Sequence, residues 1–92
     1  MPKLFMAYLG GKTNKNRIGE DHEVVIVVAE DKEGAKKKAR IKWQGEGAAH
    51  LDMLVEVKVV DGYKINLEKV HNLDSLVLDD DWAKLNPTLQ NN

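Results

Sequence analysis

The stretch LDMLVEVKVVDGYKINL, residues 51–67, decides the fold because it reads as two strands joined by a turn. Apolar residues alternate with polar ones on both sides of Asp61-Gly62. The alternating apolar residues are Leu51, Met53, Val55, Val57 and Val59 before the pair, and Tyr63, Ile65 and Leu67 after it. Since successive side chains of a strand point to opposite faces, this pattern predicts an antiparallel hairpin with one buried face and one wet face.

The register of this hairpin depends on the length of its turn. A two-residue turn at Asp61-Gly62 would pair Val60 with Tyr63, and the apolar face of one strand would continue as the polar face of the other. A three-residue loop over 60–62, with a bulge at Gly62, pairs Val59 with Tyr63 and keeps the apolar residues together. We therefore expect the three-residue loop. The wet face is then expected to carry His50, Asp52, Glu56 and Lys58.

Two further strands and one helix are expected before the hairpin. Residues 3–9 are apolar on both faces, which is typical of a central strand. Residues 22–29 are also apolar on both faces and rich in β-branched residues, which indicates a second strand. Asp31 is a suitable N-cap for a helix over about 32–44, in which Ala35, Ala39 and Trp43 form a buried stripe.

The order ββαββ predicts a single α+β domain over residues 1–70, followed by a C-terminal tail over 71–92. A strand–helix–strand crossover joins parallel strands, so the simplest sheet is mostly antiparallel and four-stranded, with strand order 2-1-3-4. One helix covers only one face of such a sheet. Either the tail or a second copy of the chain must cover the other face. Of these two, we expect a second copy, and therefore a homodimer. The expected interface residues are Leu76, Leu78, Trp82 and Leu85.

Composition excludes several classes of protein. The chain has 92 residues, with 15 acidic and 14 basic residues and no cysteine. It therefore has no disulfide framework and no thiolate chemistry. No apolar run approaches the roughly 20 residues of a membrane span. We expect a cytoplasmic protein that needs no cofactor.

The segments LFMAYLGG, EDHEVVIVVAED and HLDMLVEVKVVDGYKINL resemble a family of short uncharacterised bacterial proteins, classified as a domain of unknown function. The resemblance spans about residues 4–67. It implies that His22, Trp43, His50, Asp52 and the segment 61–63 occupy the family's motif positions. It implies no established activity, but some members appear with two copies of the unit in one chain, which fits a self-associating surface.

Histidine and carboxylate side chains form one candidate site. His50 and Asp52 are two residues apart on one strand, and His22 begins another strand next to Glu20 and Asp21. If these strand ends meet, imidazole and carboxylate groups can bind a divalent metal or share a proton. The alternative is that they order the strand ends by hydrogen bonding. Neither HExxH nor a serine beside a base is present.

A basic helix is the second candidate site. Residues 32–42 contain six lysines and arginines and one glutamate. Lysines in this helix can contact phosphates, and Trp43 can stack on a base. The nucleic-acid candidates are Lys36, Lys37, Lys38, Arg40 and Lys42. The formal net charge of −1 and the place of Trp43 on the buried stripe argue for a solvated face instead.

These patterns favour a small non-enzymatic binding or interaction module that self-associates. The alternatives are a nucleic-acid-binding protein that uses the basic helix, and a metal- or anion-binding protein or small enzyme that uses His22, His50 and Asp52.

Overall fold

The computed structural model describes residues 1–12, 14–16, 18–71 and 76. Its elements, in chain order, are β1 (Lys3–Lys12), β2 (Asp21–Ala29), α1 (Lys32–Lys42), β3 (Glu46–Glu56), β4 (Val59–Val60) and β5 (Tyr63–Lys64). The protein is therefore α+β, with one helix and antiparallel sheets in the part of the chain described.

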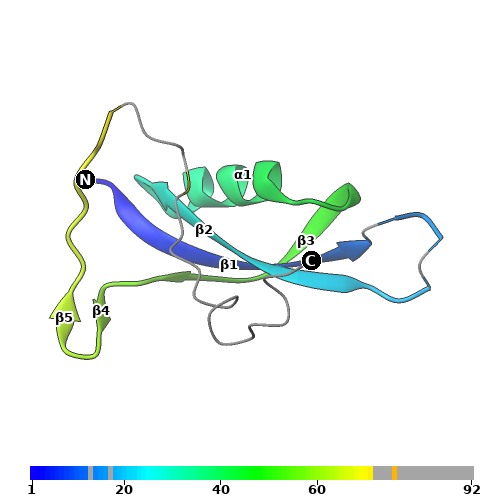
Figure 1. Cartoon of the computed structure of the whole chain (residues 1–92), viewed down its shortest axis with the longest axis horizontal. Coiled ribbons are helices and arrows are strands. Elements are labelled where there is room, and N and C mark those ends of the chain that lie inside the picture. Colours follow the sequence, from blue (N-terminus) through cyan, green and yellow to red (C-terminus); the bar gives the residue numbers. More distant parts are fainter. Residues whose placement is uncertain (13, 17, 72–75, 77–92) are drawn as a thin grey trace, which may run out of the picture.

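The main sheet has three strands in the order β2-β1-β3, and β1 pairs antiparallel with both neighbours. Because β2 and β3 both oppose β1, they run parallel to each other, and α1 connects them across one face of the sheet (Figure 1). The expected position of the first strand between the second and the third is thus observed. Among the residues that the structure describes, no helix lies on the opposite face of the sheet.

Helix α1 begins and packs as its sequence predicts. A side-chain oxygen of Asp31 accepts a hydrogen bond from the backbone N–H of Gly34 at 2.8 Å, which satisfies one free donor of the first turn. Ala35 and Ala39 are fully buried on the side that faces the sheet. Small alanines let the helix backbone approach the strands closely, and Trp43, at the C-cap, packs against the same core.

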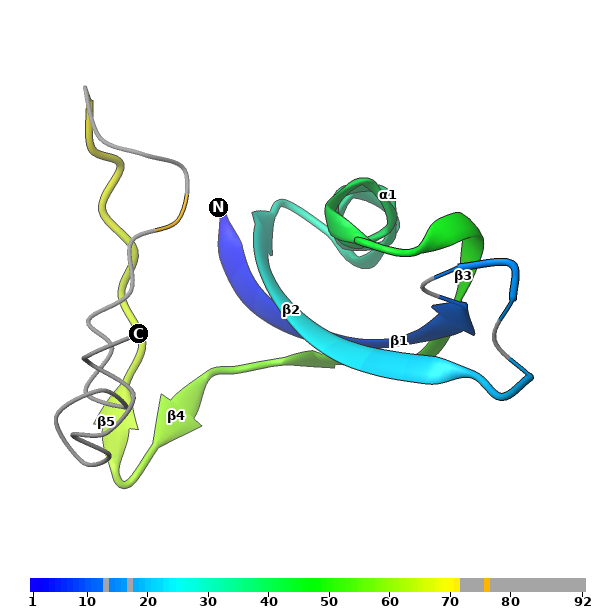
Figure 2. The ribbon, with the colours of Figure 1, turned by 45° about the vertical axis from the view of Figure 1, so that its right-hand side comes forward.

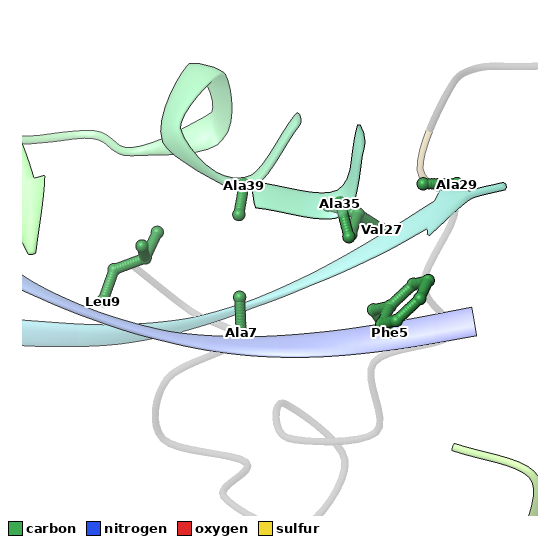
Figure 3. Close-up of a cluster of buried hydrophobic side chains, with 7 residues drawn as sticks. All are labelled: Phe5, Ala7, Leu9, Val27, Ala29, Ala35 and Ala39. Atoms are coloured by element: carbon green, nitrogen blue, oxygen red, sulfur yellow. The ribbon is translucent and has the colours of Figure 1, made fainter. Parts of the chain in front are cut away.

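The core lies between α1 and the sheet. The two alanines of the helix meet Phe5, Ala7 and Leu9 of β1 (Figure 3). Val27 and Ala29 of β2 complete the buried cluster. Only alternate residues of β1 and β2 enter this core, although residues 4–9 and 24–29 are all apolar. Large apolar side chains therefore also point to the helix-free face.

A β-bulge in β3 makes part of the expected face assignment wrong. Leu9 pairs with Leu51 but Tyr8 pairs with Met53, so Asp52 is an extra residue in β3. A bulge of this kind shifts the alternation of faces by one residue. Beyond it, Leu54 and Glu56 lie on the helix side. Met53 and Val55, which were expected in the core, are exposed on the helix-free face.

The predicted turn of the hairpin is also wrong. Val60 pairs with Tyr63 and Val59 with Lys64, so Asp61 and Gly62 form a two-residue turn. Both turn residues have positive φ, 53° and 83°, as a type I′ turn requires. The parity argument failed because it assumed that one strand runs unbroken from residue 51 to the turn, whereas β3 ends at Glu56.

The expected four-stranded sheet is not formed by the described residues. β4 and β5 make a separate two-stranded sheet, and β5 covers two residues instead of the expected span to residue 70. Leu78, Trp82 and Leu85 of the expected interface lie outside the described residues. Leu76 is within them and is exposed.

Candidate functional site

The helix-free face of the main sheet is apolar and exposed, and we call it the open face. In the middle of the face, Met6 lies between Ile26 and Val55. One step along, Tyr8 lies between Val24 and Met53. With Val28, these seven side chains are 38% to 60% exposed. All three strands of the main sheet thus contribute apolar side chains to the open face.

A histidine–carboxylate cluster occupies one end of the open face. Gly10 of β1 pairs with His22 on one side and with His50 on the other. Glu20 reaches both imidazoles: one oxygen lies 3.4 Å from His50 Nε2 and the other 3.9 Å from His22 Nε2. Asp52 adds a carboxylate oxygen 3.7 Å from His22 Nε2. The cluster therefore brings together side chains from β2, from β3 and from the loop that precedes β2.

Glycine at position 10 leaves the space that the cluster uses. A Cβ atom there would come within 2.9 Å of His22 Cδ2 and 3.0 Å of an Asp52 carboxylate oxygen. The ring of His22 also lies 5.1 Å from the ring of Tyr8, at a tilt of 55°. The apolar part of the face and the cluster are thus continuous.

The structure brings together the three residues expected to form a metal or acid–base site. His22, His50 and Asp52 converge because strand order 2-1-3 places the start of β2 and the start of β3 on either side of the end of β1. Within the residues described, however, no group of three or more such side chains is arranged to hold a metal ion. The contacts of 3.4–3.9 Å fit a loose network of ion pairs when the histidines are protonated.

Sequence reasoning missed Tyr8 and Gly10 as members of this cluster. Neither residue carries a motif by itself. The available signal was the strand order: once β1 is central, the glycine after its apolar run falls level with the two histidines.

The basic helix uses part of its charge within the protein. The ammonium groups of Lys38 and Lys42 donate hydrogen bonds to the backbone carbonyls of Val28 and Ile26, at 2.5 and 2.6 Å. Lys36 lies 3.3 Å from Glu33. The hydrogen bonds of Lys38 and Lys42 cover the outer edge of β2. Lys37 and Arg40 are exposed.

Trp43 is held by the fold and is not presented for stacking. Its ring lies against Gly11 and Gly45, where a Cβ atom would clash with it. Its Nε1 is buried and has no hydrogen-bond partner among the described residues. The half-buried ring is thus packed against the protein's own backbone and core, which weakens one support for the nucleic-acid hypothesis.

Two hollows accompany the sheet. One, of about 470 Å³, lies between the start of β1 and the segment 64–67, with Leu4, Val57 and Ile65 in its lining. The other, of about 400 Å³, lies at the outer edge of β2, where Leu76 approaches Lys38 and Lys42. Both are open, so neither encloses a small molecule as a buried site would.

Together these features define a small α+β domain whose described helix covers one face of the main sheet. The chain belongs to the family described as Domain of Unknown Function (DUF1543), whose model matches residues 17–67, more than half of its length. This match confirms the resemblance to a domain of unknown function over these residues, and the segment LFMAYLGG lies outside it. No curated protein and no solved structure matches the chain. No helix in the described part of the chain is long and apolar enough to cross a membrane.

Proposed function

We propose that this protein is a small non-enzymatic interaction module that self-associates through the open face. The observation that carries the proposal is the continuous run of seven exposed apolar side chains across all three strands of the main sheet. Such a surface is costly in water unless another apolar surface covers it.

The open face can supply part of a dimer interface. Burial of an aliphatic side chain is worth about 1.5–3 kcal/mol at about 25 cal/mol per Å², or roughly 60–120 Å², so the exposed fractions of the seven residues amount to roughly 200–400 Å². A standard interface buries about 800 Å² on each partner, whereas the largest apolar patch of a typical monomer is about 300–600 Å². The open face would therefore supply roughly a quarter to a half of one partner's side, and residues around it would supply the rest.

The edge of β2 favours association by faces over association by edges. The carbonyls of Ile26 and Val28, which point outward from this edge, already accept hydrogen bonds from lysines of α1. Lysines at a strand edge oppose the addition of another strand. A partner is thus directed to the open face, where sheets pack about 10 Å apart.

The test is the mass in solution of the unmodified protein and of two matched variants. Ile26 lies in the middle of the open face and is 43% exposed, whereas Ile41 lies on α1 and is 82% exposed. We expect the unmodified protein and Ile41→Glu to be dimers. We expect Ile26→Glu to be a folded monomer, because a second copy would bury the introduced carboxylate.

A monomeric mass of the unmodified protein at the highest concentration reached would refute the proposal and would favour coverage of the face by the tail of the same chain. A dimer that Ile26→Glu leaves intact would place the interface elsewhere.

A further inference from the structure

Within the described residues, the tip of the hairpin formed by residues 58–67, here called the arm, is exposed, while residues 64–67 border the hollow beside the start of β1. β4 and β5 contact each other but no other helix or strand of the described chain. Val59, Val60 and Tyr63 are 60%, 46% and 77% exposed. A two-stranded hairpin alone is at best marginally stable in water, so the arm needs a surface to pack on.

The arm projects from the main sheet on the same side as the open face. In both views of the chain, α1 lies on one side of the main sheet and the β4–β5 hairpin lies on the other (Figures 1 and 2). The chain leaves the main sheet beside Leu4, where the backbone N–H of Val57 donates to the Leu4 carbonyl at 2.9 Å. From there the five steps to Gly62 span about 16 Å, at roughly 3.3 Å per extended residue.

A second sheet stacked on the open face would lie about 10 Å away. The arm is therefore long enough to reach the layer of the second copy while its own sheet stays in place. In a symmetric dimer both copies do the same.

We infer that, in the self-associated protein, the arm of each copy crosses to its partner and packs across the end of the partner's open face that carries the histidine–carboxylate cluster. The inference rests on the proposed function. It adds a second contact to that interface, between the arm and the partner's open face, and it specifies how the two copies are oriented.

Charge selects this orientation. The arm carries Lys58 and Lys64 against one carboxylate, Asp61. If the two sheets stacked with their arms at the same end, these lysines and Lys3 of both copies would come together, and like charges disfavour that contact. If the arms lie at opposite ends, each pair of lysines meets the end where the partner subunit's Glu20 and the partner subunit's Asp52 lie.

Apolar contacts agree with the same orientation. Val60 and Tyr63 form a cross-strand pair, so both side chains lie on one face of the arm. The open face beside the cluster offers Tyr8, Val24 and Met53. Aromatic and aliphatic side chains on both surfaces can then bury one another. Lys58 lies on the same face of the arm as Val60, whereas Lys64 lies on the opposite face with Val59.

The absence of cysteine from the sequence makes the contact testable by site-specific cross-linking. The experiment uses the double variant Tyr63→Cys/His50→Cys and a short bismaleimide. The two positions lie at opposite ends of the main sheet within one chain, because His50 pairs near the end of β1 and the arm leaves beside its start. A bridge between them therefore has to join two copies. The controls are Tyr63→Cys alone and His50→Cys alone, and circular dichroism checks that each variant is folded.

We expect covalent dimers for most of the double variant and only traces for the single variants. A dimeric mass with no cross-link in the double variant overturns the arm inference and leaves the proposed function standing. Efficient cross-linking of Tyr63→Cys alone also overturns it, since the arms then meet at the same end. A monomeric mass of the unmodified protein overturns the arm inference together with the proposed function.

Discussion

Replacing Leu9 by alanine is expected to remove a large part of the stability of the domain. Its side chain is fully buried, and it is one of three large side chains in that state, with Phe5 and Val27. Leu-to-Ala changes in buried sites cost about 3–5 kcal/mol, from the lost transfer free energy and the cavity left behind. A domain of this size has a free energy of unfolding of about 5–14 kcal/mol. The single substitution thus removes between a quarter and most of it.

Urea unfolding followed by circular dichroism measures this loss. At a slope of about 1–1.5 kcal/mol per molar urea, the midpoint should fall by roughly 2–5 M, or the protein should be unfolded without urea. A fall of less than about 0.5 M would refute the placement of Leu9 in the centre of the core.

The matched control is Met6→Ala, on the same strand but on the open face. Met6 is 39% exposed, so its truncation should cost about 1 kcal/mol or less in dilute protein. If the open face is the dimer interface, the cost of Met6→Ala should grow with protein concentration, because association stabilises the folded state by mass action.

Three further changes test particular contacts. Asp31→Ala should lower the free energy of unfolding by about 1 kcal/mol and Asp31→Asn by much less, as measured by urea unfolding, because only the former removes the N-cap acceptor. Gly62 has a φ of 83°, so Gly62→Ala should weaken the arm hairpin, which NMR spectra would show. The melting temperature of the main domain should shift by less than about 2 °C. A shift near the 4–8 °C expected for about 1 kcal/mol would mean that the arm is packed on its own chain. Removing both edge lysines, in Lys38→Ala/Lys42→Ala, should increase aggregation in light scattering relative to Lys37→Ala, and equal aggregation would show that the lysines do not protect the β2 edge.

Local patterns predicted the elements that depend on local physics. Asp31 predicted the start of the helix because an N-cap carboxylate accepts a hydrogen bond from a free backbone N–H group two or three residues later. This contact is local, so it forms wherever the helix lies in the fold. The spacing of Ala35 and Ala39 predicted the buried side of the helix for a similar reason, since a period near 3.6 places them one above the other. The position of the first strand between the second and the third followed from the strand–helix–strand crossover, which makes the second and third strands parallel.

The hairpin shows where such reasoning ends. The alternation of apolar and polar residues over 51–67 was correct locally, but the residues do not keep to the same faces along the whole stretch. The bulge at Asp52 and the end of β3 at Glu56 each interrupt the alternation. A single extra residue exchanges the two faces of a strand, so Met53 and Val55 moved from the expected core to the open face. The cluster was half predicted. His22, His50 and Asp52 were expected to matter together, whereas Tyr8 and Gly10 joined them only through pairing across strands.

By itself the sequence determined the α+β class, the family, the capped helix and the presence of a sheet with more apolar surface than one helix can cover. These features depend on residue type and spacing within short segments, where steric and hydrogen-bonding preferences act. The tertiary structure alone decided the bulge, the turn of the arm, the convergence of the cluster around Gly10 and the side to which the arm projects. Each of these depends on which strand lies beside which and in what register, and that is set by contacts between residues far apart along the chain.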